Sequence, residues 1–185
     1  MPDPIEMLIK DHREVEALFE RYRSTPTPAL IEEICTELTV HTAVEEKVVY
    51  PVLGSSVDGG RQMRSHAEDE HGEVKEQMLK LETLGYDSPE ADLCMQKIIQ
   101  GVTEHVSEEE GEVLPAMRSQ LTEERMMSIG EEAMAAKEAF MAEAQQAGPL
   151  IDLTKDELYK LAQEKGIEHR SDMNKKELIS ALRAR

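Results

Sequence analysis

The sequence predicts an all-α protein: an up-down-up-down four-helix bundle, with a fifth helix along its outside and a small helix-extended-helix module at its C-terminal end. Three features of the 185-residue chain support this prediction. Apolar residues recur at spacings of three and four almost throughout, no segment alternates apolar and polar residues as a strand does, and short turn motifs separate the helical stretches. Four amphipathic helices joined by short connections pack most readily as such a bundle.

The first two helices are separated by turn-forming residues. The first begins at residues 3–4 and runs to the stretch 24–28, where Thr27 and Pro28 are a suitable N-cap and first residue for the second helix. Spacings of three and four place one apolar face on each helix. These faces carry Ile5, Leu8, His12, Val15, Phe19, Tyr22, Ile31, Ile34, Leu38, His41, Glu45 and Val48.

The third and fourth helices follow after a proline and a loop. We expect Pro51 to bend or end the second helix, because proline cannot donate the backbone hydrogen bond of a helix interior, and residues 54–60 to form a loop. The third helix then covers 61–84 and stops at Gly85, and the fourth opens at residues 88–89 with a serine N-cap and a proline. Their inner faces carry Ala67, His71, Val74, Met78, Leu81, Cys94, Ile98, Val102, His105, Glu109 and Val113.

The rest of the chain divides into a fifth helix and a C-terminal module. Thr122 is a suitable N-cap for a helix over 123–147 that is rich in Ala and Met. We therefore predict three parts: residues 1–147 form the bundle with its fifth helix, 148–152 form a linker, and 153–185 form the module.

Two similar segments, LTKDELYKLA (153–162) and MNKKELISAL (173–182), make up most of the module. Each opens with a capping box, in which Thr or Asn is followed three residues later by Glu, and Gly166 ends the first helix. A small core is expected from Leu153, Leu158, Leu161, Ile167, Met173, Leu178 and Leu182. The module resembles SAP-like modules and the N-terminal domain of the Rho terminator. That resemblance implies contact with nucleic acid, while a protein partner and a purely structural role stay open.

Charge is distributed unevenly along the chain. The formal net charge is −18; residues 150–185 hold 8 basic and 7 acidic residues, a net charge of +1, and the first 149 residues carry −19. An acidic body of this kind repels nucleic acid and anionic membranes. Any nucleic-acid binding is therefore expected to be weak and confined to 153–185.

Nothing in the sequence points to a membrane or to an oxidising compartment. The first twenty residues carry charges throughout, unlike a signal peptide, and no apolar run approaches the roughly 20 residues of a membrane span. Cys35 and Cys94 lie in apolar patterns and outside any CxxC pair, so we interpret them as reduced core residues; a disulfide or ligand role stays open. These features predict a cytoplasmic protein without membrane partners.

One pattern occurs twice, as HTAVEEKVVYP at 41–51 and HVSEEEGEVLP at 105–115. The copies share a His, two Glu four and five residues later, a Val and a Pro. Residues four apart lie on one helix face, with Cβ atoms about 5–6 Å apart, so each copy aims an imidazole and a carboxylate at one point. With the single histidines of the other two helices, the inward polar set is His12, His41, Glu45, His71, His105 and Glu109.

A metal site explains this set better than a hydrogen-bonded core does. A lone His on an apolar face is usually a core residue, but a buried carboxylate without a countercharge is expensive, and Lys and Arg are scarce on these faces. Six N and O ligands exceed a tetrahedral zinc site, and carboxylates from opposite helices suit two ions. These considerations favour iron, with manganese as the less favoured alternative. A metal-free bundle would leave the two inward glutamates unexplained.

At these residues the chain resembles the hemerythrin-like, HHE cation-binding family. The resemblance covers about residues 1–147 and depends on DHREVE around His12, EHGEVK around His71 and the two repeated segments. It implies a four-helix bundle with a non-haem di-iron centre of the Fe–O–Fe type. The implied ligands are the six residues above: the two glutamates bridge the irons, the histidines of the first two helices bind one iron, and the histidines of the last two bind the other.

One position departs from the oxygen-carrying members of that family. They have a second His four residues after the first His of the third helix, and this chain has Lys75 there. A charged ammonium cannot be an ordinary ligand, so we expect Lys75 either to extend outward or to hydrogen-bond to an anion on the iron. The iron bound by His71 and His105 then keeps an open position. His66 lies about 140° around the helix from His71 and is interpreted as a surface residue.

Two classes of function stay open for such a centre. The first is an enzyme or scavenger of dioxygen, peroxide or nitric oxide in oxidative or nitrosative stress, and the open position favours peroxide or nitric oxide chemistry. The second is a sensor whose iron or redox state changes helix packing and reaches the C-terminal module. Both imply two irons per chain, and no candidate ligand lies beyond Glu109.

Overall fold

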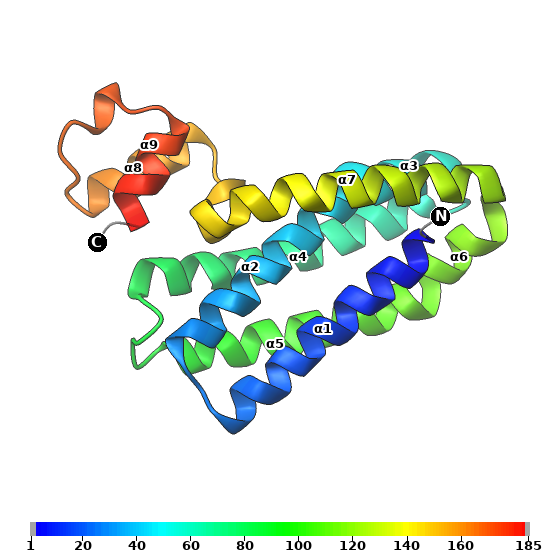
Figure 1. Cartoon of the computed structure of the whole chain (residues 1–185), viewed down its shortest axis with the longest axis horizontal. Helices are drawn as coiled ribbons and strands as arrows, with labels where there is room; N and C mark the ends of the chain where they lie inside the picture. The colour runs from blue at the N-terminus through cyan, green and yellow to red at the C-terminus, as the bar shows by residue number, and fades with distance from the viewer. Residues whose placement is uncertain (1–2, 184–185) are drawn as a thin grey trace.

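The computed structural model describes residues 3–183, in which a bundle of long helices carries a smaller helical unit at one end (Figure 1). Residues 1–2 and 184–185, at the ends of the predicted domains, lie outside the described part of the chain. Over residues 3–183 every regular element is helical, which confirms the predicted all-α class. None of these helices is long and apolar enough to cross a membrane.

Four helical elements form the bundle. A side-chain N-cap begins each of the first two: Asp3 for the first and, as predicted, Thr27 for the second. Asp3 accepts a hydrogen bond from the backbone N–H of Ile5 at 2.9 Å, and the Thr27 hydroxyl accepts one from Leu30. The bundle elements are α1 (Pro4–Ser24), α2 (Pro28–Val44) with η1 (Glu45–Val49) and α3 (Tyr50–Ser56), α4 (Gly60–Leu84), and α5 (Ala91–Glu108) with η2 (Glu109–Val113) and α6 (Leu114–Gln120). They alternate in direction along the bundle (Figure 1).

The second helix does not end at Pro51, and residues 54–60 are not a loop as we expected. The helix continues to Ser56, and the connection before α4 is only 57–59. A π-helical turn, η1, precedes the proline, and in it the N–H of Tyr50 donates to the carbonyl of Glu45. This wider turn inserts one residue into the helix and moves aside the carbonyl that the proline ring would otherwise meet. The turn η2 stands before Pro115 in the same way.

The fourth helix begins later than the serine and proline at 88–89 predict. The N–H of Ala91 donates to the carbonyl of Ser88 at 3.1 Å, so residues 88–91 form a turn and α5 begins at Ala91. The end of the preceding helix is as predicted. Gly85 follows α4 with φ of 93°, a backbone conformation that favours glycine.

The fifth helix, α7 (Glu123–Ala147), runs along the outside of the bundle beside α2 (Figure 1). Its N-cap is Thr122, as predicted. Its aromatic residue Phe140 lies under the Lys47 ammonium of η1, 4.3 Å from the ring centre. The fifth helix therefore packs on the element that carries one of the predicted ligands.

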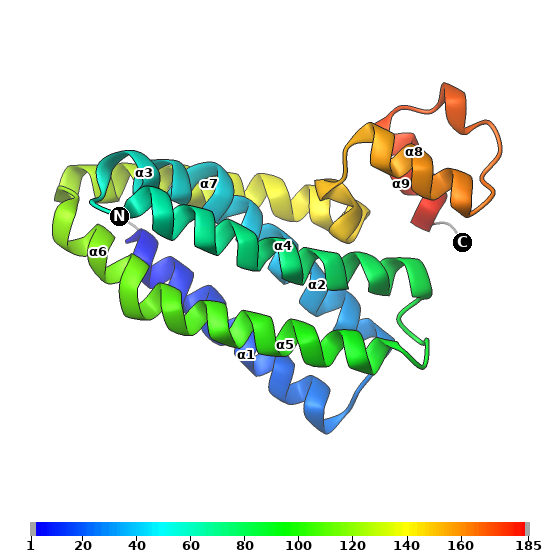
Figure 2. The same cartoon turned by 180° about the vertical axis from the view of Figure 1, so that it is seen from behind.

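Two apolar clusters fill the bundle on either side of the polar inner residues. One contains the inner faces of α1, α2, α4 and α5 at one end, and the other contains residues of α3, α6 and α7 at the opposite end. Figure 2 shows α4 and α5 packed side by side. Cys35 and Cys94 lie buried in the first cluster with free side chains, which confirms that they belong to the core.

The C-terminal module packs against the end of the bundle. Its elements are α8 (Lys155–Glu164), η4 (Arg170–Asp172) and α9 (Lys175–Arg183), preceded by the 3-10 helix η3 (Gly148–Asp152). Both predicted capping boxes are present, at Thr154 with Glu157 and at Asn174 with Glu177. The predicted core residues are buried or partly buried there, and Leu79 of α4 joins them.

Candidate metal centre

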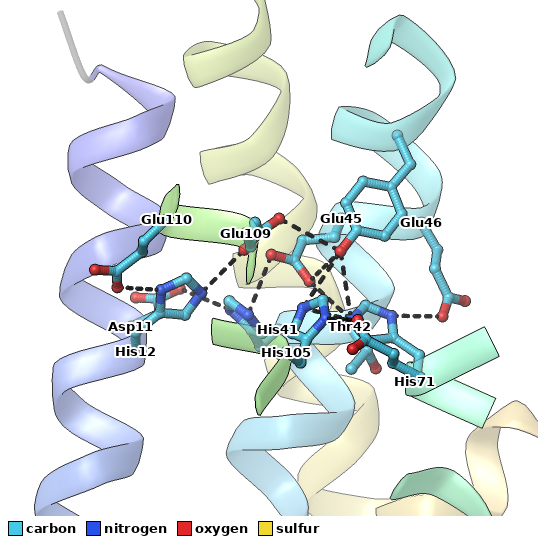
Figure 3. Close-up of polar contacts among 12 residues, drawn as sticks. Asp11, His12, His41, Thr42, Glu45, Glu46, His71, His105, Glu109 and Glu110 are labelled. Atoms are coloured by element: carbon cyan, nitrogen blue, oxygen red, sulfur yellow. Dashed lines mark hydrogen bonds and ion pairs between the residues drawn. The ribbon is translucent and has the colours of Figure 1, made fainter. Parts of the chain in front are cut away.

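The structure brings all six candidate ligands together in the middle of the bundle (Figure 3). We call these six residues, His12, His41, Glu45, His71, His105 and Glu109, the inner set. Each is 7% exposed or less. Their possible ligand atoms form two groups, and within each group the atoms lie within 4.8 Å of one another. The first group is His12, His41, Glu45 and Glu109, and the second is Glu45, His71 and His105. Glu45 belongs to both groups, so the geometry suits two ions that share this carboxylate.

Imidazole nitrogens and carboxylate oxygens of the inner set face one another at short distances without forming hydrogen bonds. His12 Nε2 lies 3.2 Å from Glu109 Oε2, and His41 Nε2 lies 3.2 Å from Glu45 Oε1. Within residues 3–183 these four buried atoms have no hydrogen-bond partner. Buried polar atoms are rarely left in this state, and a cation coordinated by imidazole nitrogens and carboxylate oxygens satisfies them together. The residues therefore fit a metal centre.

The charge balance of the inner set also favours a cation. Burial raises the pKa of Glu45, but His41 and His71 lower it by more, to well below its usual value. Burial and the Glu45 charge raise the pKa of Glu109. Burial lowers the pKa of His41, yet Glu45 and Asp11 outweigh it and raise that pKa to about 10. Without metal the cluster thus holds protons, which a metal ion would replace.

A second layer of carboxylates holds the histidines from behind (Figure 3). We call Asp11, Glu46, Glu70 and Glu110 the outer carboxylates. The contacts are His12 Nδ1 to Glu110 Oε1 at 2.8 Å, His71 Nδ1 to Glu46 Oε1 at 2.9 Å, His105 Nδ1 to Glu70 Oε2 at 2.9 Å, and His41 Nδ1 to Asp11 Oδ2 at 4.0 Å. The first three are hydrogen bonds, whereas 4.0 Å is too long for one, and His41 Nδ1 has no hydrogen-bond partner within residues 3–183. A donated Nδ1–H leaves Nε2 as the free ligand atom, so these three hydrogen bonds favour the tautomer that a metal needs.

Cations neutralise three of the outer carboxylates. Lys137 Nζ lies 2.5 Å from Asp11 Oδ1, Lys75 Nζ lies 2.9 Å from both oxygens of Glu46, and Arg13 Nη2 lies 2.6 Å from Glu110 Oε2. The ammonium of Lys75 thus reaches outward to Glu46, and its side chain is 22% exposed; the sequence analysis did not identify Glu46 as its partner. Lys137 belongs to α7, so the fifth helix positions Asp11 beside His41.

A tyrosine that the sequence analysis missed lies at the centre of the second group. Tyr50 is fully buried, and its hydroxyl is 3.3 Å from Glu45 Oε2 and from Glu109 Oε1. The same oxygen lies 3.4 Å from His71 Nε2 and 3.5 Å from His105 Nε2. Burial, with the charges of the two glutamates, raises the pKa of Tyr50 well above its usual value, so its phenol can donate a hydrogen bond into the site.

A small cavity touches the four imidazoles. Its volume is about 20 Å³, close to the space that one water-sized molecule occupies. Its lining is His12, Val15, Leu38, His41, Thr42, Glu70, His71, Val74, Val102, His105 and Val106. The valines make this space mostly apolar, which suits a small neutral molecule better than a hydrated ion.

The sequence carries one signal for the outer carboxylates, which is their position next to the candidate ligands. Each outer carboxylate is adjacent in the chain to one of the six candidate ligands, as in Asp11-His12 and Glu45-Glu46. The doubled Glu of each repeat therefore has two roles: the first residue faces inward, and the second holds a histidine of another helix. His66 was interpreted correctly as a surface residue, since its side chain is 60% exposed.

Two segments of the chain match known families. Residues 3–117 match the hemerythrin HHE cation binding domain, and residues 150–185 match the N-terminal domain of the Rho termination factor. A crystal structure of a hemerythrin HHE cation binding domain-containing protein from Mycobacterium kansasii superposes with a TM-score of 0.68 at 23% identity, covering 78% of this chain and 91% of that one. This likeness shows a shared fold.

Two curated proteins are similar in sequence. One is a DNA nickase of Nostoc sp., 29% identical over 131 residues, which are 69% of this chain and 37% of that protein. The other is a hemerythrin-like protein of Schizosaccharomyces pombe, 24% identical over 127 residues, which are 66% of this chain and 63% of that protein. The chain thus spans less than two thirds of the length of either relative.

Proposed function

Because the chain belongs to the hemerythrin HHE cation-binding domain family, we propose that its inner set holds two iron ions, with manganese as the less favoured metal. His12 and His41 bind one ion, and His71 and His105 bind the other. Glu45 and Glu109 serve both. The two groups of ligand atoms, and the buried atoms without hydrogen-bond partners, support the assignment of the histidines and the shared role of Glu45. The shared role of Glu109 rests on the family resemblance.

We propose that this centre binds dioxygen, nitric oxide or peroxide and takes part in oxidative or nitrosative stress handling. The observation that carries the proposal is the apolar cavity of about 20 Å³ against the four imidazoles. It has room for one small molecule beside the ligand nitrogens, and its valines keep bulk water away. Larger substrates do not fit this space.

The chain's own residues have distinct tasks at the centre. Iron, when bound, supplies a redox-active Lewis acid for the small molecule. The outer carboxylates hold the imidazoles in the ligand tautomer. Tyr50 places its hydroxyl beside His71 and His105, where the sequence predicts an open position, and would donate a hydrogen bond there to a polar ligand such as peroxide.

Metal analysis of the purified full chain tests the centre itself. We expect two irons per chain in protein prepared without chelators, and loss of most of the metal in Glu45→Ala and in Glu109→Ala, because each carboxylate serves both ions. Stoichiometric zinc without iron, from cells grown with ample iron, would contradict the di-iron proposal.

Filling the cavity tests the small-molecule site. Val102→Leu adds a methylene group to the cavity wall, so it should reduce binding of nitric oxide and dioxygen, measured by visible spectroscopy, while the iron content stays the same. Val52→Leu, in the apolar cluster beyond the site, is the matched control for core overpacking and should bind both gases as the wild type does. Equal binding in both variants would place the ligand elsewhere.

A second candidate function is a sensor that signals through the C-terminal module. It is favoured by Arg183 of α9, whose guanidinium lies 2.5 Å from Glu32 of α2 and 3.5 Å from Glu82 of α4. Both α2 and α4 carry candidate ligands, so a shift of one helix relative to the other would alter these two ion pairs of Arg183. The match to the Rho domain and the name of the Nostoc relative make DNA the first partner to test. DNA affinity that is equal with and without bound metal would exclude the sensor.

A further inference from the structure

A second cluster of metal-ligating side chains lies on the surface beside the buried centre. His66 and Glu70 stand one turn apart on α4 and face Glu108 of α5. His66 Nε2 lies 2.9 Å from Glu108 Oε2 and 3.8 Å from Glu70 Oε1. One nitrogen and two carboxylate oxygens of this surface trio therefore lie within 4.8 Å of one another.

The charge of this trio differs from that around the other outer carboxylates. Those three each contact a lysine or arginine, which carries a fixed positive charge. Glu70 instead faces an imidazole, and Glu108 shares that imidazole. The other three carboxylates thus each have a fixed cation beside them, whereas Glu70 and Glu108 share one imidazole, and a divalent ion bound here would meet two carboxylates and one imidazole.

We propose that His66, Glu70 and Glu108 hold an exchangeable divalent transition-metal ion, which supplies the buried centre. Imidazole and carboxylate ligands suit Fe²⁺, Mn²⁺ and Zn²⁺ alike. The His66 side chain is 60% exposed and that of Glu108 54%, so water completes the coordination and the ion exchanges readily. Such a site concentrates metal at the surface without trapping it.

The surface trio is connected to the inner set through both helices. Glu70 Oε2 accepts the Nδ1–H of His105 at 2.9 Å, while the other oxygen of Glu70 faces the trio. Glu108 directly precedes Glu109 in the chain. The inner ligands are almost inaccessible to solvent, so incoming ions need a first binding place near them. The supply role rests on the proposed buried centre; ion binding by the trio does not.

Mn²⁺ binding to the full chain, with its buried metal retained, tests the trio. Bound Mn²⁺ is counted by the loss of the free-ion electron paramagnetic resonance signal. We expect one additional, weak site in the wild type, weakened roughly ten-fold or more by His66→Asn and by Glu108→Gln. Matched controls are His169→Asn, at another exposed histidine, and Glu112→Gln, an exposed acid of the neighbouring turn; both should keep the site. Absence of the additional site, or equal affinity in all five proteins, would overturn the proposal.

The supply role is tested by reloading. Metal is removed with a chelator, Fe²⁺ is added without oxygen, and iron retained after gel filtration is followed over time. We expect His66→Asn and Glu108→Gln to load several-fold more slowly, yet to reach the iron content of the controls. Equal loading rates would overturn the supply role. If the wild type retained no buried iron, the proposed function would fail, and Mn²⁺ binding to the same variants would still decide the surface site.

Discussion

At the scale of single residues, neighbours in the chain belong to different layers of the site: one is a candidate ligand, and the next is an outer carboxylate that bonds to a histidine. Consecutive helical residues point about 100° apart, so one can face the interior while its neighbour reaches across to the next helix. Glu45 faces inward, and Glu46 holds His71 of α4. Glu109 and Glu110 repeat the arrangement toward His12 of α1. Each contact between an outer carboxylate and a histidine therefore depends on the correct packing of two helices.

Lys75 offers a test of this second layer. Lys75→Met removes the cation that binds both oxygens of Glu46, so Glu46 should hold His71 less firmly, and metal affinity should fall roughly ten-fold. Competition with a chelator, followed by metal analysis, measures the change. Lys80→Met, which breaks an exposed pair with Glu76 on the same helix, is the control and should keep its metal. Equal metal retention by the two variants would mean that Lys75 does not contribute to metal binding.

Tyr50 offers a test of the ligand position. Tyr50→Phe should keep the fold and the metal, because the hydroxyl lies 3.3 Å or more from each neighbour, but it removes the donor that faces the second group. The visible spectrum of the peroxide or nitric oxide complex should therefore shift. Tyr22→Phe, whose hydroxyl bonds to Asp92, is the matched control and should leave the spectrum unchanged. Identical spectra for the Tyr50 variant and the wild type would place its hydroxyl beyond reach of the ligand.

At the scale of elements, the π turns explain why Tyr50 escaped sequence analysis. In a regular α-helix a residue five places after Glu45 lies about 140° away around the axis, off the inner face. The turn η1 is closed by the N–H of Tyr50 bonding to the Glu45 carbonyl, which brings the tyrosine back over the glutamate. The other repeat has Leu114 at this place. The two halves of the bundle therefore differ where the ligand is proposed to bind.

The parts that could be predicted from the sequence are those set by local spacing. Apolar periodicity placed the inner faces of the helices correctly, and cap motifs located the beginnings of α2 and α7. The π turns depend on how proline is accommodated within a packed bundle, so a pattern based on 3.6 residues per turn could not reveal them. Partners such as Lys75 with Glu46 depend on which helices are neighbours, and that follows only from the tertiary structure.

Two helical glycines test how closely α4 and α5 pack. A Cβ at Gly72 would meet no atom within 4 Å, so Gly72→Ala should raise the free energy of unfolding by about 0.5–1 kcal/mol. A Cβ at Gly101 would lie 3.2 Å from Cγ2 of Val74, which lines the cavity. Gly101→Ala should therefore gain no stability and should weaken nitric oxide binding. Urea denaturation and gas titration measure the two effects, and an equal gain in stability would argue against tight packing at Gly101.

At the scale of the whole molecule, the C-terminal module is attached to the bundle by apolar and charged contacts. Leu79 of α4 packs against the module's apolar cluster, and Arg183 reaches two bundle helices. Deleting residues 150–185 should leave the metal content unchanged, because no candidate ligand lies there. It should lower the bundle's stability by about 1–2 kcal/mol through the exposure of apolar surface. Metal analysis and thermal denaturation of the shortened chain check both parts; loss of metal would show that the module supports the centre.

At the scale of the whole molecule, a rise in pH should destabilise the metal-free bundle, and bound metal should prevent this loss of stability. In the metal-free protein, burial lowers the pKa of His71, but Glu45 and Glu46 outweigh it and raise that pKa from 6.5 to about 9, while the pKa of His41 is raised to about 10. Protons bound more tightly in the folded state stabilise it fully below pH 6.5, and this stabilisation is lost as the pH rises through 9 and 10. The metal-free bundle should thus become less stable over this range.

Metal ions need deprotonated imidazoles, so the metal-loaded bundle should not share this loss. The difference in melting temperature between loaded and metal-free protein should accordingly widen from pH 6 to pH 10. Thermal denaturation at both ends of this range, with metal content verified, measures it. His41→Gln removes the more strongly shifted imidazole, so its metal-free form should lose less stability on the way to pH 10. Parallel curves for loaded and metal-free wild type would mean that protons and metal do not compete for the same nitrogens.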